Sequence, residues 1–145
     1  NAQIPAHLAN KLVELFGGNS NEELFEQKFG DQPVILFGEG YGVKINGGGA
    51  YRPDVSFILF DVYLPAGNIW LKRDAVEDIA RTFNIDVVPI IMRGTIKQAV
   101  DYVKTKPVST IGTAKMEGLV GRPAVELNDR MGRRVITKIK AVDFE

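Results

Sequence analysis

The sequence predicts a mixed α+β fold in which antiparallel β-sheets are flanked by helices. Three observations favour this class: apolar residues recur at helical spacing over 8–29, a β-branched and aromatic run spans 55–63, and short apolar runs follow one another after 118. Strands that are neighbours along the chain favour antiparallel pairing. With 145 residues, 45% of them hydrophobic and 25% charged, the chain suits one globular domain.

Four segments show the spacing of helices: 8–16, 20–29, 74–83 and 96–103. Thr95 and Gln98 have the spacing of a capping box, which predicts the start of the fourth helix. Ser20 and Glu23 repeat that spacing at the second helix.

Strands are expected at 34–37, 55–63, 87–91, 119–120, 124–127 and 135–142. Six of the twelve residues in 38–49 are glycine, which predicts tight turns and a close approach of the backbone to its neighbours. Asp61 lies within the apolar run 55–63, so its carboxylate needs a partner.

Composition excludes several classes of function. There is no cysteine, so a disulfide scaffold, thiol catalysis and cysteine-ligated zinc are excluded. No apolar run approaches the ~20 residues that cross a bilayer. The net charge is zero, but 1–92 carry a net −5 and 93–145 a net +5. The basic part is either an anion-facing surface or an ordinary solvated one.

Three short stretches carry polar groups that suit chemistry. The first, Gly38-Glu39-Gly40-Tyr41-Gly42, places a carboxylate between glycines, yet it has neither the dinucleotide fingerprint nor a Walker A loop. The second places Glu117 before Gly118, where its carboxylate suits a hard cation. The third puts Lys138 and Lys140 on one face of a strand, where an anion would relieve their repulsion. Taken singly, a glycine turn, a loop acid and a solvated strand face explain them as well.

Together and in order, these stretches resemble the covalent nucleotidyltransferases, which include ATP-dependent RNA ligases, DNA ligases and mRNA capping enzymes. The resemblance rests on Phe37-Gly-Glu39-Gly-Tyr41-Gly, Phe57-x-x-Phe60-Asp61-Val62, Glu117-Gly-Leu-Val120 and Lys138-Ile-Lys140. They are similar to motifs III, IIIa, IV and V of that superfamily. The first is most similar to small RNA ligases of the phage type.

The resemblance implies a nucleotidyltransferase (ATP-grasp-like) ligase core over 1–145 and a role for each motif residue. Glu39 would bind the ribose hydroxyls of ATP, and Phe60 would stack on the adenine. Glu117 would place Mg²⁺ (or Mn²⁺) near the α-phosphate. Lys138 and Lys140 would hold that phosphate and stabilise its charge during transfer. We therefore expect these five side chains to converge on one mononucleotide.

Four arginines of the basic part match no motif. We expect them to contact the polynucleotide backbone, with ordinary surface arginines as the alternative: Arg122, Arg130, Arg133 and Arg134.

The sequence departs from the superfamily at its first motif, Lys-x-Asp-Gly, whose lysine takes up AMP. No lysine of the chain is followed by that pattern. Because the chain begins with Asn1, we interpret it as an N-terminally truncated piece that does not adenylylate itself. We expect it to expose unpaired strand edges, to cover them by association, or to retain the missing N-terminal segment as a separate peptide.

The expected function is that of an ATP-dependent RNA ligase, with roles such as RNA repair, joining 5′-phosphate and 3′-hydroxyl ends through enzyme-AMP and AMP-capped intermediates. Its partners would be ATP and RNA (or DNA) ends, without a membrane, in the cytoplasm, or in the host cytoplasm if phage-encoded. The alternatives are a DNA ligase, a GTP-using capping nucleotidyltransferase and a non-catalytic nucleic-acid-binding module. The last alternative predicts salt-sensitive binding of RNA without a nucleotide requirement.

Overall fold

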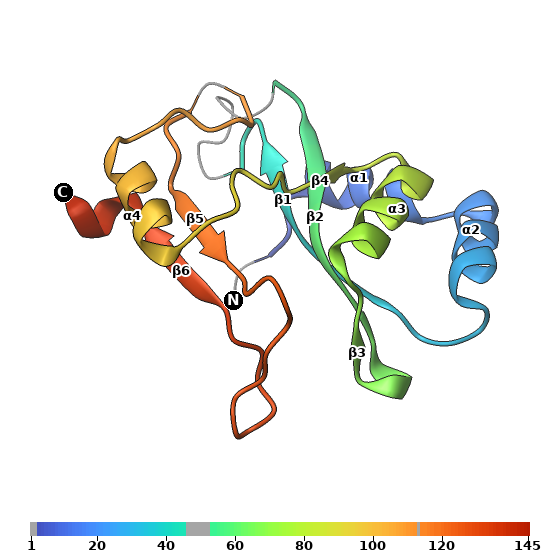
Figure 1. Cartoon of the computed structure of the whole chain (residues 1–145). Helices are drawn as coiled ribbons and strands as arrows, with labels where there is room; N and C mark the ends of the chain where they lie inside the picture. Colours follow the sequence, from blue (N-terminus) through green and yellow to red (C-terminus); the bar gives the residue numbers. More distant parts are fainter. Residues whose placement is uncertain (1–2, 46–52, 113) are drawn as a thin grey trace. The chain divides into compact units, whose positions relative to one another are not determined.

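The structure, a computed structural model, describes residues 3–45, 53–112 and 114–145. It consists of two compact units, Asn1–Pro89 and Ile90–Glu145 (Figure 1). The first unit contains α1 (Ala6–Phe16), α2 (Asn19–Phe29), β1 (Ile35–Gly42), β2 (Val55–Leu64), β3 (Ile69–Trp70), α3 (Arg73–Phe83) and β4 (Asp86–Val87). The second contains α4 (Ile96–Lys104), β5 (Gly118–Gly121), β6 (Thr137–Lys140) and the 3₁₀ helix Ala141–Phe144.

Strand β2 is the centre of the sheet in the first unit. It pairs with β1 and β3 antiparallel, as the sequence predicts, and with β4 parallel. The parallel pair is possible because α3 lies between β3 and β4 in the chain and supplies the crossover that parallel strands need. Among the described residues, β4 covers only Asp86–Val87, which is shorter than the predicted strand 87–91.

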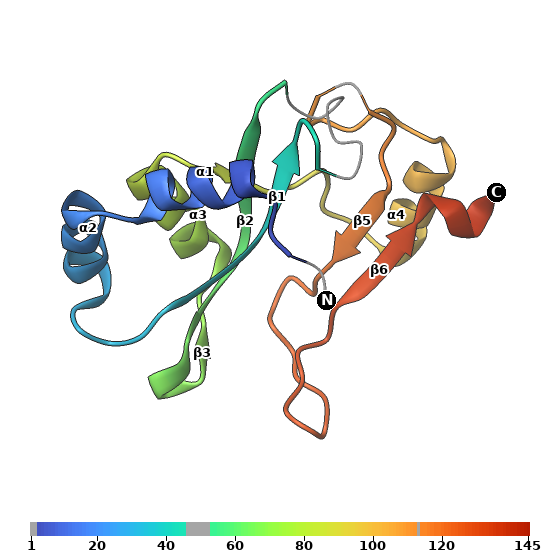
Figure 2. The ribbon, with the colours of Figure 1, turned by 180° about the vertical axis from the view of Figure 1, so that it is seen from behind.

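Helices cover one face of this sheet. Leu59, Val62 and Leu64 of β2 form a core with buried residues of α2 and α3, and Phe16 of α1 packs against it. Both views show α1, α2 and α3 close to one another beside β2 (Figure 1, Figure 2). The predicted capping box at Ser20 is wrong: α2 begins at Asn19, and Gly18 is its N-cap without a side-chain hydrogen bond.

The glycines before residue 43 form strand, so the tight turns predicted for 38–42 are wrong, whereas the predicted close approach of the backbone is confirmed. Strand β1 runs through to Gly42. The reason is close packing: a Cβ on Gly38 would lie 2.3 Å from the Phe57 ring, and one on Gly40 would lie 2.3 Å from Leu8. Glycine at these two positions therefore lets β1 lie close to Leu8 of α1 and to Phe57 of β2. The rest of the glycine-dense stretch, 46–49, lies outside the described residues.

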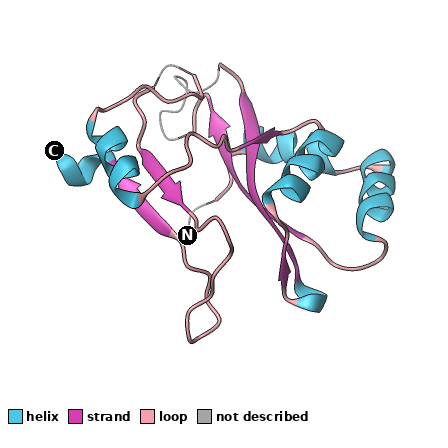
Figure 3. Cartoon of the chain, viewed as in Figure 1, coloured by secondary structure: helices cyan, strands magenta, loops and turns pink. Residues whose placement is uncertain are grey.

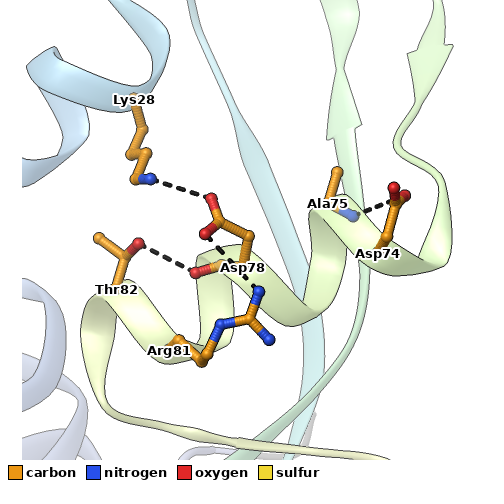
Figure 4. A network of polar contacts seen from close by, with 6 residues as sticks. All are labelled: Lys28, Asp74, Ala75, Asp78, Arg81 and Thr82. Atoms are coloured by element: carbon orange, nitrogen blue, oxygen red, sulfur yellow. Dashed lines mark hydrogen bonds and ion pairs between the residues drawn. The ribbon is translucent and has the colours of Figure 1, made fainter.

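An ion pair joins α2 to α3 on the surface of the first unit. Lys28 Nζ lies 2.9 Å from Asp78 Oδ2, and Arg81 also faces this carboxylate at 3.8 Å (Figure 4). The hydrogen bond from Lys28 and its positive charge hold the pKa of Asp78 below its ordinary value.

In the second unit, α4 packs against the β5–β6 pair (Figure 3). The capping box predicted at its start is confirmed, since Gln98 N–H donates to Thr95 Oγ1 and Thr95 N–H donates to Gln98 Oε1. The buried side chains here are Val103, Met116 and Ile139. Ile96, at the first helical position, is 60% exposed.

The connection 122–136 between β5 and β6 forms a separate turn, the basic arm, shown in dark orange below the two strands in Figure 1. The strand predicted at 124–127 is absent from it, and the one predicted at 135–142 is confined to Thr137–Lys140. A bridge between Asn128 and Arg134 and a hydrogen bond from Val135 N to Leu127 O close the arm. In the described part of the chain, no helix is long and apolar enough to cross a membrane.

Candidate functional site

Glu39 and Phe60 lie on the same face of the first unit's sheet, opposite the helices. Leu59 and Val62 both point into the core, with two residues between them instead of one. The pairing shifts at this point, so Phe60 and Asp61 together oppose Phe37. This β-bulge turns Phe60 away from the helices. Glu39 pairs with Ile58. A Cβ on either neighbouring glycine, Gly38 or Gly40, would point toward the helical side of the sheet, so the Glu39 side chain points to the opposite face.

The Phe60 ring is half-buried and differs from the other phenylalanines. Six of the eight phenylalanines contact another aromatic ring, and Lys104 lies over the ring of Phe144. Within the described residues, Phe60 alone has neither kind of partner. Its ring is therefore suited to stack on a flat ligand.

The acid Asp61 is 3% exposed on the same face and does have an interaction partner, which the sequence required. No buried side-chain oxygen or nitrogen among the described residues lacks a hydrogen bond. Glu39, in contrast, is exposed and forms no ion pair within the described residues, which leaves its carboxylate available to a ligand.

A contact that sequence reasoning missed lies beside Glu39. The hydroxyl of Tyr41, two residues along β1, donates a hydrogen bond to the Asp86 carboxylate on β4. Because side chains alternate along a strand, the sequence does predict that Tyr41 lies on the same face as Glu39. Nothing in the sequence signals Asp86, because its position depends on the parallel pairing of β4 with β2.

In the second unit, the predicted alternation along β6 is confirmed. Ile139 is only 6% exposed and lies on a strand that packs against α4, whereas Lys138 and Lys140 on either side of it are exposed. Val120 pairs with Lys138 and Gly118 with Lys140, so this face carries two ammonium groups and few other side chains. Within the described residues neither lysine forms an ion pair, and the pair of charges is suited to bind an anion.

Glu117 directly precedes β5 and lies next to the same strand ends. Its carbonyl oxygen accepts a hydrogen bond from Ala141 N at 2.8 Å, which continues the ladder by one residue past Lys140. Residues two apart on a strand share a face, yet Glu117 is exposed whereas Leu119 pairs with the buried Ile139. Met116, before Glu117, is buried. The alternation of side chains therefore reverses at Gly118, and the Glu117 carboxylate points outward.

The carboxylate of Glu117 fits a magnesium ion that takes its other ligands from water and a bound phosphate. In the part of the chain that the structure describes, no three histidine, cysteine or acidic side chains gather to form a complete metal site. Mg²⁺ is commonly held by one or two carboxylates, with waters and substrate phosphates as its other ligands. A single exposed carboxylate beside two lysines suits a metal that arrives with a phosphate.

The four arginines differ in how they are engaged. Arg133 Nε lies 2.8 Å from Asp129 Oδ2, and Arg134 faces Glu126 at 3.9 Å. Arg122 also has an interaction partner. Arg130, beside the highly exposed Met131 at the tip of the basic arm, has no ion-pair partner in the described ranges. Arg130 is thus the best placed of the four to meet a polyanion.

The structure therefore groups the predicted residues into two sets. Glu39 and Phe60 share one sheet face of the first unit. Lys138 and Lys140 share one face of the β5–β6 pair in the second, and Glu117 directly precedes β5 at the end where Gly118 pairs with Lys140.

Comparison with known proteins assigns a family. A family model described as RNA ligase matches residues 5–140, which is nearly the whole chain. The chain belongs to the RNA ligase family. No curated protein matches it.

Solved structures agree on the fold. A Naegleria gruberi RNA ligase variant without ligand is 20% identical, with a TM-score of 0.65, and the match covers 98% of this chain and 41% of that one. A variant solved with ATP and Mn is 18% identical with a TM-score of 0.66, and another with AMP and Mn is 20% identical with the same score; both matches cover 98% and 41%. The chain spans about two fifths of the length of these structures. The predicted α+β nucleotidyltransferase fold is confirmed.

Proposed function

We propose that the chain is the nucleotide-binding part of an ATP-dependent RNA ligase and that both units belong to its adenylyltransferase domain. The family match over 5–140 carries this proposal. It is supported by the two Naegleria ligase structures that contain ATP or AMP with Mn, to which this fold is similar.

Glu39 and Phe60 bind the nucleoside in this proposal. The exposed carboxylate of Glu39 accepts hydrogen bonds from the ribose hydroxyls. The Phe60 ring, which has no ring partner of its own among the described residues, stacks on the adenine. Their positions as diagonal neighbours on β1 and β2 suit a base and its ribose.

Lys138 and Lys140 bind the phosphates. Two ammonium groups on one strand face hold the α-phosphate and balance the charge that develops on it during transfer. Glu117 holds Mg²⁺ (or Mn²⁺), which supplies Lewis-acid polarisation of the phosphoryl oxygens when bound.

The reaction proceeds by three displacements at phosphorus. A lysine nitrogen displaces pyrophosphate from the α-phosphorus of ATP, and the 5′-phosphate of an RNA end then displaces the lysine from that AMP. Finally, a 3′-hydroxyl attacks the capped 5′-phosphate and AMP departs. Positioning and charge stabilisation supply the catalysis. Since no lysine here is followed by x-Asp-Gly, these 145 residues bind ATP without forming the covalent adduct.

The basic arm contacts the RNA backbone through Arg130, which is exposed at its tip. Arg122, Arg133 and Arg134 add positive charge while engaged with partners of the chain. Phosphate contacts of this kind position an RNA without reading its sequence.

The outer edge of β1 is covered by association, either with a further segment of the protein or with a second copy. Among the described residues no strand pairs with that edge. An apolar hollow beside it is lined by Leu12, Val13, Phe16, Gly17, Leu36 and Phe57. Exposed edges of this kind are normally covered. Sedimentation at rising concentration tests the second copy, with Val13→Glu as the variant that prevents its docking.

Nucleotide binding tests the proposed function. The chain, with Mg²⁺, is titrated with ATP and with GTP by calorimetry, and then denatured to look for a labelled covalent adduct. We expect binding of ATP in preference to GTP and no adduct. Preference for GTP favours a capping nucleotidyltransferase. A chain that binds RNA in a salt-sensitive way but no nucleotide is the non-catalytic module instead, and a DNA ligase is recognised by its choice of polynucleotide.

A further inference from the structure

We propose that Asp86 is a positioning residue that acts through Tyr41 on Glu39 and thereby helps the site prefer a ribonucleotide to a 2′-deoxyribonucleotide. This inference rests on the proposed role of Glu39 at the ribose. Neither Asp86 nor Tyr41 touches the nucleotide in it.

A single row across three strands relates the residues. Glu39 on β1 pairs with Ile58 on β2, and Ile58 pairs in turn with Asp86 on β4. Paired residues of adjacent strands point to the same face. Glu39 and Asp86 are therefore at the two ends of one row on the face opposite the helices.

Tyr41 connects the ends of this row. It follows Glu39 by two residues on β1, so the two side chains share a face and their Cα atoms lie about 7 Å apart. The Tyr41 hydroxyl reaches across β2 and donates its hydrogen bond to the carboxylate of Asp86. A hydrogen bond to an ionised acceptor is stronger than one between neutral groups.

The local sequence explains why such a tether matters. Glu39 has Gly38 and Gly40 on either side, and Gly42 follows Tyr41 with a φ of 110°. Glycines give the backbone more freedom than other residues. Among the described residues, the contact of Tyr41 with Asp86 adds a restraint on the outer face to the ladder with β2.

Strand β4, which carries Asp86, is held in place by packing and by backbone hydrogen bonds. Val87 packs against the hydrophobic core, and Val88 N donates to Leu59 O at 2.9 Å. On the other side, Ile85 N donates to Ala80 O at the end of α3. Asp86 is thus fixed by its neighbours, and the exposed Glu39 gains order from it through Tyr41.

The test measures the ratio of dissociation constants for 2′-deoxy-ATP and ATP with Mg²⁺. We expect the unmodified chain to prefer ATP by about tenfold, as hydrogen bonds to a charged group allow, and Glu39→Ala to remove the preference. Tyr41→Phe and Asp86→Ala should each lower the ratio about threefold by weakening ATP alone. The double variant should be no worse than either single one, because both remove the same contact. Asp86→Asn keeps an acceptor and should retain most of the ratio.

Tyr63→Phe is the matched control, because it removes a tyrosine hydroxyl that donates to Asn68 at 2.8 Å elsewhere in the same sheet. It should leave the ratio unchanged. If Glu39→Ala removes the preference while folded Tyr41→Phe and Asp86→Ala keep it, the positioning role is overturned. An equal loss in Tyr63→Phe overturns it as well. A chain that binds both nucleotides equally and ignores Glu39→Ala refutes the ribose role of Glu39 itself, and the inference with it.

Discussion

Gly118 lies directly opposite Lys140 in the β5–β6 pair, and there is no room for a side chain between them. A Cβ on Gly118 would lie 2.1 Å from the Ile139 carbonyl oxygen and 2.9 Å from the Lys140 Cα. The glycine of the Glu117-Gly118 motif is therefore a packing requirement. It lets the strand with Glu117 approach the strand with the lysines.

Gly118→Ala should separate these strands and destabilise the second unit by about 2 kcal/mol, the typical cost of overpacking. Protection of the Ile139 and Ala141 amides in hydrogen exchange measures the effect. Val120→Ala on the same strand is the control, since Val120 is 58% exposed and should have little effect. Equal protection in Gly118→Ala and the unmodified chain would refute the packing argument.

Removing either lysine of β6 should weaken the binding of ATP but not of adenosine. Lys138→Ala and Lys140→Ala each delete a charge facing the phosphates, and we expect a loss of tenfold or more, roughly 1.5 kcal/mol, in ATP affinity. Lys97→Ala is the control because Lys97 is paired with Asp101 at 2.8 Å on α4. Calorimetric titration measures all three variants. A similar loss for adenosine would show that the lysines act on folding and not on phosphate.

Phe60→Ala should lose base stacking, about 1–3 kcal/mol of binding free energy for one base. Phe60→Tyr keeps a ring of the same shape and should retain most of the affinity. Because Phe60 lies outside the core, the thermal midpoint should change little in either variant. ATP titration followed by fluorescence or calorimetry makes the comparison. Equal affinity of Phe60→Ala and Phe60→Tyr would remove the ring from the site.

The tip of the basic arm should lose its order in acid. Asp129 accepts hydrogen bonds from the backbone N–H groups of Arg133 and Met131 and from the Arg133 guanidinium. The backbone N–H of Arg133 is the main cause that lowers the pKa of Asp129 in the folded chain. The stabilisation is therefore fully present above the ordinary aspartate pKa and disappears as pH falls through the lowered one.

Amide exchange of Met131 and Arg133, followed from neutral pH downward, measures this loss. Asp129→Asn carries no titrating carboxylate and should remove the pH dependence. Asp101, whose pKa is lowered chiefly by its hydrogen bond from Lys97, gives a reference titration on α4. An arm whose amide protection factors, corrected for the intrinsic pH dependence of exchange, are the same at acid and neutral pH would contradict the role of Asp129.

Local chemistry was predictable from the sequence. The capping box of Thr95 and Gln98 involves residues three apart, and both of its hydrogen bonds form. The alternation of Lys138, Ile139 and Lys140 follows from the period of a strand and is confirmed by their exposure. The run 55–63 forms most of β2 for the same reason.

Features that depend on distant partners were not predictable. The glycines of 38–42 predicted tight turns or a close backbone approach, and only the positions of Leu8 and Phe57 show what the strand approaches. The bulge at Phe60 depends on the register with β1, and the contact of Tyr41 with Asp86 joins residues 45 apart. At 124–127, apolar residues suggested a strand, but the structure has none there, and the chain turns farther along, at 129–133, through hydrogen bonds to Asp129.

The proposed function rests on this chain binding ATP, and on Glu39 and Lys138 each contributing to that binding. Calorimetry of the chain with ATP and Mg²⁺, repeated with Glu39→Ala and Lys138→Ala, tests this most directly. We expect one ATP per chain and about tenfold weaker binding in each variant. ATP binding that keeps its affinity in both variants would contradict it.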